Sequence, residues 1–316
     1  MFETTTTYQK QNLEINSCIN DILKTVLYFD SFQYPLTIEE IKDFSRFTIE
    51  EIKENLEVLI AKKNIYKLEN YYSIISKKSR IERRKKGNAR AEQILKKAKK
   101  VSKLISQFPF VEAVFVSGSL SKGYFGEDDD IDYFIITSPN RLWIARTLLI
   151  LYKKIFLLNS KKYFCVNYFM SSNSLLVKEQ NRFTATEFVT LIPMSGNGTY
   201  EELKNKNTWI LDYFPNYNYK KKSKQIQRKA MKRFLEFLLK GKIGNALEKK
   251  FMKITQKHQQ KKFKKLQKRD FDIAFKSDKN TSKHHPHNHQ VRVIGMLNEK
   301  IKAFNKKHQL SIPLEK

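Results

Sequence analysis

Hydrophobic residues near the start of the chain recur at intervals of three and four positions, the spacing of one face of an α-helix. These residues are Leu13, Ile15, Ile19, Ile22, Leu23, Val26 and Leu27. An aromatic-rich turn follows over residues 29–35, and two shorter helical patterns come after it. The pattern therefore predicts a small helical unit at the beginning of the chain.

Two sequence signatures mark where the second and third helices begin. Thr37 with Glu40, and Thr48 with Glu51, have the spacing of a capping box, in which the two side chains satisfy free amides of the first turn. The β-prone runs 65–68 and 71–75 then predict a hairpin. Three helices followed by a hairpin are typical of a winged helix, so we expect a winged-helix-like domain over residues 13–78.

Winged helices often bind DNA, and the third helix would then enter the major groove. Its exposed positions carry four acidic residues, Glu50, Glu51, Glu54 and Glu57. An acidic face repels the phosphate backbone, so a scaffolding role or a protein contact is favoured for this domain over DNA binding.

The rest of the chain divides into three further segments. Residues 79–108 read as a strongly basic linking helix, and residues 109–218 alternate between strands and helices. The expected elements of this central region are strands at 111–117, 130–137 and 162–169 and a helix at 141–157. Residues 219–316 are expected to form a basic helical domain that ends with a helix at 290–307. The fold class is therefore α+β, with a mixed sheet in the central domain.

Charge is concentrated in the C-terminal third of the chain. The net charge is +29, and from Lys220 onward 29 Lys and Arg stand against 7 Asp and Glu, a local balance of +22. A polyanionic partner, including a nucleic acid that contacts this third, is one interpretation. The other is coding bias, because the excess is mostly Lys and accompanies many Asn and Ile.

Composition also limits where the protein works. Its two cysteines, Cys18 and Cys165, give no disulfide framework and suit a reducing cytosol. No apolar signal core precedes residue 12, and the apolar stretch 142–158 is interrupted by three cations. We therefore expect a cytoplasmic protein without a membrane span.

The residues that suggest chemistry lie between an apolar strand ending at Ser117 and a second strand that opens Asp130-Ile-Asp132. Side chains alternate along a strand, so both carboxylates are expected on one side. Paired carboxylates suit Mg²⁺ or Mn²⁺, which can clamp the oxygens of a phosphoryl transfer. Gly118 allows phosphate to approach the backbone, and Ser119 offers donors at a helix start.

This segment resembles the DNA polymerase beta-like nucleotidyltransferase superfamily, whose signature is Gly-Ser, about ten residues, and Asp-apolar-Asp. Ten residues, 120–129, separate Gly118-Ser119 from Asp130. Short sequence segments, such as residues 28–35 and 184–187, also resemble those of a bacterial group of that superfamily. In that group a winged-helix-like segment precedes the transferase. The resemblance implies a mixed-sheet transferase core, a nucleoside triphosphate such as ATP as substrate, and metal at Asp130 and Asp132.

Many members of the superfamily place a third carboxylate on the next strand, where this chain has Asn167. An amide can coordinate a metal or hydrogen-bond a nucleotide, but it cannot act as a general base. Glu187 is a candidate base by comparison with relatives that use a Glu on a neighbouring helix, although a capping or surface role is the alternative. Lys122 is expected to contact the triphosphate. A site that only binds nucleotide also stays open.

Four other features have simpler explanations. Asp128 and Asp129 are expected in a solvated loop, and Trp143 in the core rather than stacked on a base. The four histidines of residues 283–289 suggest zinc, but a solvated loop or phosphate-facing patch is favoured because cysteines and helical spacing are lacking. The Lys-rich run 261–268 is expected to be a solvated helix face, and the alternative is a surface that attracts RNA or an acidic acceptor.

The sequence thus predicts an Mg²⁺-dependent nucleotidyltransferase that transfers a nucleoside monophosphate to a hydroxyl acceptor. The acceptor, a small molecule, a protein or an RNA, is not identified by the sequence. Two alternatives belong to other classes: a nucleic-acid-binding regulator with a vestigial transferase site, and a protein-modifying transferase of the toxin–antitoxin type.

Overall fold

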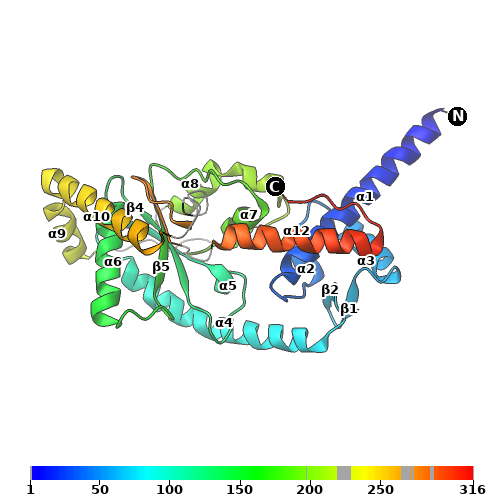
Figure 1. Cartoon of the computed structure of the whole chain (residues 1–316), viewed down its shortest axis with the longest axis horizontal. Helices are drawn as coiled ribbons and strands as arrows, with labels where there is room; N and C mark the ends of the chain where they lie inside the picture. Colours follow the sequence, from blue (N-terminus) through cyan, green and yellow to red (C-terminus); the bar gives the residue numbers. More distant parts are fainter. Residues whose placement is uncertain are drawn as a thin grey trace.

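The computed structural model describes residues 2–196, 198–218, 229–264, 271, 274–284 and 288–315, with side chains from residue 16 onward. A helical unit lies at one end, a sheet in the middle, and α9 (Ala230–Leu238) and α10 (Gly241–Lys262) at the other end (Figure 1). No helix in the described ranges combines the length and the apolar character needed to cross a membrane.

The N-terminal unit has the element order that the pattern predicts. It comprises α1 (Phe2–Asp30), α2 (Ile38–Asp43), α3 (Ile49–Ala61), β1 (Tyr66–Leu68) and β2 (Tyr71–Ser73). Both capping boxes are present, since Thr37 caps α2 with Glu40 and Thr48 caps α3 with Glu51. The assignment of this unit as a winged helix stays a prediction.

Helix α4 (Lys78–Ile105) runs from the N-terminal unit to the sheet. Arg84 fixes the junction: its guanidinium donates two hydrogen bonds to the Glu40 carboxylate at 2.7 and 2.8 Å. It also lies over the rings of Tyr34 and Tyr71. Because Arg84 is buried and paired, the helix and the N-terminal unit are held in one arrangement.

The central sheet is mixed and five-stranded, with strand order β6-β3-β4-β5-β7. Its strands are β3 (Val111–Ser117), β4 (Asp132–Thr137), β5 (Cys165–Ser171), β6 (Ile192–Ser195) and β7 (Thr281–Lys283). β4 and β5 are parallel, and the other neighbours are antiparallel. The expected strand at 130–137 begins two residues later, so Asp130 precedes the strand and only Asp132 lies on it.

Both faces of the sheet are covered. Val114, Tyr133 and Ile135 point to the side of α4 and α6 (Leu142–Phe156), whereas Phe115 and Phe134 pack with Phe188 and Tyr200 of α7 (Arg182–Val189) and α8 (Thr199–Lys206). A 3-10 helix, η1 (Thr208–Asp212), follows α8. The alternation of buried residues along each strand therefore produces two hydrophobic cores.

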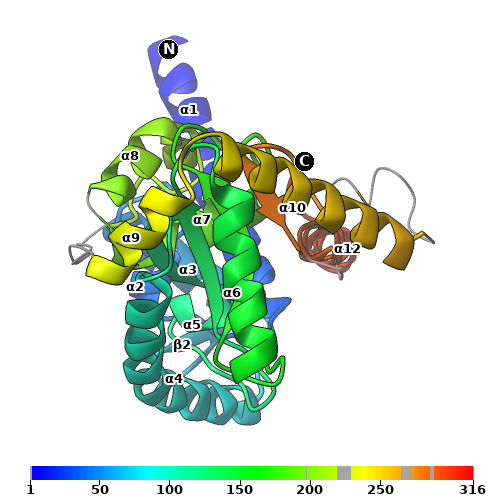
Figure 2. The ribbon, with the colours of Figure 1, turned by 90° about the vertical axis from the view of Figure 1, so that its left-hand side faces the viewer.

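Helix α10 (Gly241–Lys262) follows α9 (Ala230–Leu238) and crosses α6 (Figure 2). The buried Glu248 of α10 accepts hydrogen bonds from the amides of Trp143 and Ile144 at 2.8 and 2.9 Å, which satisfies the start of α6. Trp143 is fully buried, as predicted for a core residue.

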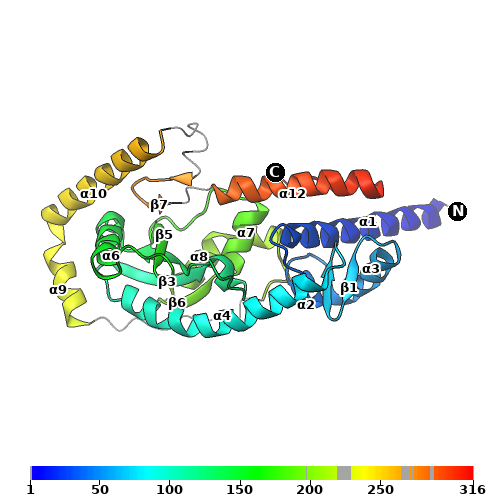
Figure 3. The same ribbon diagram turned by 60° about the horizontal axis from the view of Figure 1, so that its bottom comes forward.

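The C-terminal segment is helical in part only. Its strand β7 pairs with β5, and its last helix, α12 (His289–His308), packs against α1 and α7 (Figure 3). The sequence pattern predicted a helical domain here, and the pairing instead joins this segment to the central sheet. A strand of Thr-Ser-Lys has no hydrophobic alternation that would reveal it.

Candidate functional site

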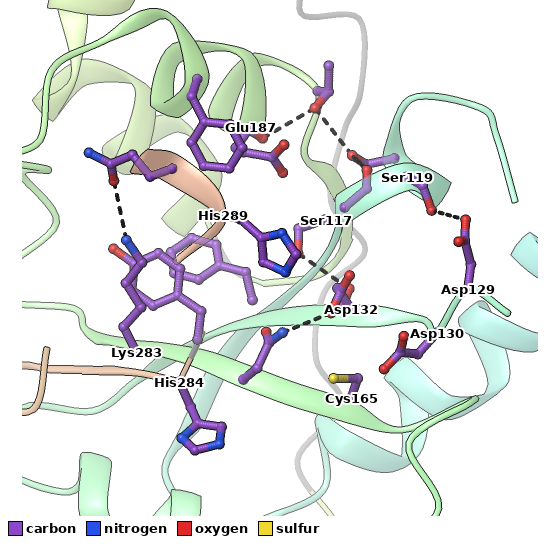
Figure 4. A pocket seen from close by; sticks show the side chains of 18 of the residues that line it. Ser117, Ser119, Asp129, Asp130, Asp132, Cys165, Glu187, Lys283, His284 and His289 are labelled. Carbon is purple, nitrogen blue, oxygen red and sulfur yellow. Dashed lines mark hydrogen bonds between the residues drawn. The ribbon is translucent and has the colours of Figure 1, made fainter. Parts of the chain in front are cut away.

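Three strand ends meet at one edge of the sheet. Ser117, the last residue of β3, pairs with Asp132, the first residue of β4, and Asp132 pairs on its other side with Cys165, the first residue of β5. β3 runs antiparallel to β4, whereas β5 runs parallel to it. The C-terminal end of β3 therefore lies beside the N-terminal ends of β4 and β5. Figure 4 shows Asp130, Asp132 and Cys165 gathered at this edge.

The Asp132 carboxylate is the centre of the group. Asn167 donates a hydrogen bond from its Nδ2 to Asp132 Oδ1 at 2.8 Å. Burial, followed by the negative charge of Asp130, raises the pKa of Asp132 to about 7. The side chains of Asp130 and Asp132 therefore repel each other, which is the electrostatic situation that a bound cation relieves.

Gly118 lies directly against this carboxylate. Its backbone has φ +67°, and a Cβ atom on it would be 2.4 Å from Asp132 Oδ2. Both the left-handed conformation and the close approach require glycine. The Gly-Ser turn and the Asp-apolar-Asp segment, which the sequence separates by ten residues, are thus in contact.

Ser119 lies on α5 (Gly118–Ser121), and its hydroxyl donates to Asp129 Oδ2 at 2.7 Å. The same oxygen accepts a hydrogen bond from the amide of Gly126 at 2.8 Å. Asp129 therefore orders the loop before β4, whereas a solvated position was expected for it. Asp128 is exposed, in agreement with the expectation.

Lys122 and Glu187 form an ion pair, with 2.7 Å between Nζ and Oε1. Lys122 also donates to the carbonyl oxygen of Gly118 at 3.1 Å. Glu187 lies on α7, whose first turn is capped by Asn181, which accepts a hydrogen bond from the amide of Thr184. The two residues for which the sequence predicted separate roles are thus directly coupled beside the Gly118 turn.

Cys165 is a site residue that sequence reasoning missed. Burial, and then the charges of Asp132 and Asp130, raise the pKa of its thiol, which therefore stays protonated. The only signal in the sequence was its position at the start of the strand that follows the two carboxylates. A single cysteine has no chemistry that would by itself indicate a position beside them.

The donor set at this edge fits a magnesium ion. Within the described residues, no three His, Cys, Asp or Glu side chains are grouped so that they could hold a metal ion. The neighbouring carboxylates of Asp130 and Asp132 are the two side chains here that could contact one. Mg²⁺ retains waters and commonly takes one or two carboxylates together with substrate phosphates. Two neighbouring carboxylates, one of them with a raised pKa, match that chemistry.

The carboxylates of Asp130 and Asp132 line a cleft of about 1640 Å³. It extends from Phe32 and Tyr34 of the N-terminal unit, past Asp132, to α6, α10 and the start of α12. His289 and His284 both line this cleft, and Figure 4 shows them with Asp132. His285 and His287, and the Lys residues at 265 and 268, fall outside the described residues.

Comparison with known proteins gives one match. Residues 92–190 match the family model described as a nucleotidyltransferase domain, a range that contains Gly118, Asp130, Asp132 and Glu187. No curated protein matches the chain. No solved structure matches it.

Proposed function

With residues 92–190 identified as a nucleotidyltransferase domain, we propose that the chain transfers a nucleoside monophosphate from a nucleoside triphosphate to a hydroxyl acceptor. The observation that carries the proposal is the placement of the Asp132 carboxylate against Gly118 and beside Asp130, where a phosphate and a cation can meet. Asp130 and Asp132 hold Mg²⁺ in this proposal, or Mn²⁺.

In the proposed reaction, an oxygen of the acceptor forms a bond to the α-phosphorus and the bond from that phosphorus to the bridging oxygen breaks. Pyrophosphate leaves with the electron pair, and the hydroxyl proton passes to a base on the protein. The ion held by Asp130 and Asp132 would supply positive charge to the reacting oxygens. Gly118 and Ser119 orient the triphosphate, and the amide of Asn167 fixes the rotamer of Asp132.

In this proposal Lys122 contacts the triphosphate and Glu187 accepts the proton of the acceptor hydroxyl. The Lys122 ammonium lies between the Gly118 carbonyl and the Glu187 carboxylate, within reach of a phosphate at the Gly118 turn. A triphosphate that attracts Lys122 releases Glu187 from its cation, and a carboxylate without a partner is the better proton acceptor. In this scheme nucleotide binding prepares the base.

The test is incorporation of label from each α-labelled nucleoside triphosphate, with Mg²⁺ or Mn²⁺ and a cell extract as the source of acceptors. We expect label to appear with the wild type and to be lost in the double variant Asp130→Ala/Asp132→Ala. Asp128→Asn, which removes a neighbouring exposed carboxylate, is the matched control and should retain incorporation. Equal incorporation by the wild type and the double variant would contradict the proposal.

A further inference from the structure

One arm of the cleft is lined by cations. It lies between α6, α10 and the end of β7, and we call it the basic arm, defined by Arg146, Lys153, Gln259, Lys262 and His284. Arg146 Nη1 donates to Thr255 Oγ1 at 3.4 Å, which holds the guanidinium between α6 and α10.

The positive charges of the basic arm are not balanced by acids. Among the residues that the structure describes, Arg146, Lys153 and Lys262 form no ion pair with a carboxylate. Burial lowers the pKa of Arg146 to about 10. Burial, followed by the charges of Arg146, Lys161, Lys262 and Lys153, lowers the pKa of His284 to about 4. Gathering these cations therefore costs free energy, which a bound anion would offset.

Two buried hydrogen-bonding atoms in the arm also lack a protein partner among the described residues. Gln259 is 2 % exposed, and its Oε1 accepts from Ser277 Oγ at 2.9 Å, which leaves Nε2 as an unused donor. His284 packs between Phe263 and Phe275, and its Nδ1 is likewise unused. Buried polar atoms are normally paired, so the unused Gln259 donor gives the arm the chemistry of a site that receives an acceptor oxygen.

The basic arm is continuous with the part of the cleft that Asp130 and Asp132 line. Both belong to the same cleft, and the charge of Lys153 interacts with the thiol of Cys165, which adjoins Asp130 and Asp132. Ser119 and Asp129 lie on the other side of Asp132 from Cys165 and His284 (Figure 4). A triphosphate at Gly118 and Ser119 therefore leaves the basic arm for the second substrate.

We propose that the basic arm binds a phosphate group of the acceptor, so that the hydroxyl substrate is a small phosphate monoester. This inference rests on the proposed function, because it assigns the second substrate of that reaction. Lys262 is exposed, but Lys153 is 9 % exposed and Gln259 is 2 % exposed. This burial favours a compact phosphate, whereas an extended nucleic acid requires an exposed row of cations.

Binding measured without nucleotide or metal tests the arm independently of transfer. Isothermal titration calorimetry with inorganic phosphate, and with ribose 5-phosphate against ribose, separates the phosphate from the hydroxyl groups of the probe. We expect both phosphate-bearing probes to bind and ribose not to bind. Arg146→Gln and Lys262→Gln should each weaken that binding about tenfold, since a charge-assisted hydrogen bond is lost. Lys257→Gln, which removes an exposed cation from α10 outside the cleft, should bind as the wild type does.

Gln259→Glu distinguishes an anion site from a structural cluster. A carboxylate placed among these cations should abolish phosphate binding and raise the Tm, because it supplies the missing negative charge. Lost binding together with a lower Tm would show a merely structural role and overturn the proposal.

Titration with Mg²⁺–ATP separates this inference from the proposed function. Arg146→Gln should retain Mg²⁺–ATP affinity within twofold; a tenfold loss would assign the arm to the triphosphate instead. Failure of the phosphate probes to bind, with tight Arg146-dependent binding of a short single-stranded RNA, would replace the small acceptor with a nucleic acid. Absence of label transfer combined with retained phosphate binding would instead contradict the transferase and leave the anion site standing.

Discussion

Lys122 Nζ lies 2.7 Å from Glu187 Oε1, so a cation and a carboxylate that the chain separates by 65 positions neutralise each other beside the Gly118 turn. Their side chains are 18 % and 25 % exposed, which leaves both within reach of a substrate in the cleft. The negative charge of a bound triphosphate would attract Lys122 and repel Glu187. Removing Lys122 should therefore affect the reaction differently from removing Glu187.

Replacing each partner of this pair should have a distinct kinetic effect. Lys122→Met is expected to raise the KM for the nucleoside triphosphate about tenfold, because a charged hydrogen bond to phosphate is lost. Glu187→Gln is expected to lower kcat by about a hundredfold with little change in KM, as for a general base. Steady-state kinetics measure both values. The exposed pair Lys85–Glu69 is the matched control, and Lys85→Met should leave both constants unchanged. A change confined to KM in Glu187→Gln would exclude the base role.

Asp132→Asn should stabilise the protein without metal while it abolishes transfer. The pKa of Asp132 is raised from 3.8 to about 7, so the folded state holds this proton more tightly than the unfolded state. The free energy of unfolding of the wild type therefore falls as pH rises from about 4 to 7. At pH 8 without divalent ions, the Tm of Asp132→Asn should exceed that of the wild type by a few degrees, on the order of 1 kcal/mol.

Addition of Mg²⁺ should raise the Tm of the wild type above that of Asp132→Asn. Wild type at pH 8 should gain Tm with increasing Mg²⁺, and the gain should diminish below pH 7 as Asp132 is protonated. Asp132→Asn should show no such gain and should lose at least about a hundredfold in transfer rate. An equal Mg²⁺ response of the variant and the wild type in differential scanning calorimetry would remove Asp132 from the ligand set.

Gly118→Ala should combine strain with a steric clash, and Gly123 separates the two effects. Both glycines have positive φ, +67° and +74°, but a Cβ on Gly123 meets nothing within 4 Å whereas one on Gly118 meets Asp132 Oδ2 at 2.4 Å. Each alanine variant should lose about 1–2 kcal/mol of stability from the left-handed backbone. Only Gly118→Ala should also lose Mg²⁺ binding and transfer. Full activity of a folded Gly118→Ala protein would contradict the predicted contact.

Asn167→Asp should convert the amide beside Asp132 into a third carboxylate. Without metal the extra charge should lower the Tm, because Asn167 now donates a hydrogen bond to Asp132 at 2.8 Å and the aspartate would repel it. Mg²⁺ affinity, measured by calorimetry, should increase about tenfold with the added ligand charge. Asn167→Ala, which removes the hydrogen bond without adding charge, is the comparison. An unchanged Mg²⁺ affinity in Asn167→Asp would place residue 167 outside the metal site.

The sequence by itself determined the features that arise from neighbouring residues. The capping boxes at Thr37 and Thr48 depend on contacts three residues apart, and β3 follows from the apolar run at residues 113–116. The Gly118–Ser119 turn and the Asp130–Asp132 pair were recognisable because their chemistry requires a fixed local spacing. These short-range interactions are encoded in consecutive positions, so they can be read without knowledge of the fold.

Only the tertiary structure decided which distant residues meet. β7 joins β5 across more than a hundred positions, and Cys165 reaches Asp132 through strand register. The hydrogen bond from Ser119 to Asp129 and the ion pair between Lys122 and Glu187 depend on how a loop and a helix pack beside α5. The basic arm likewise forms because α10 crosses α6. Such contacts are selected by the packing of whole elements, and no local pattern in the chain specifies that packing.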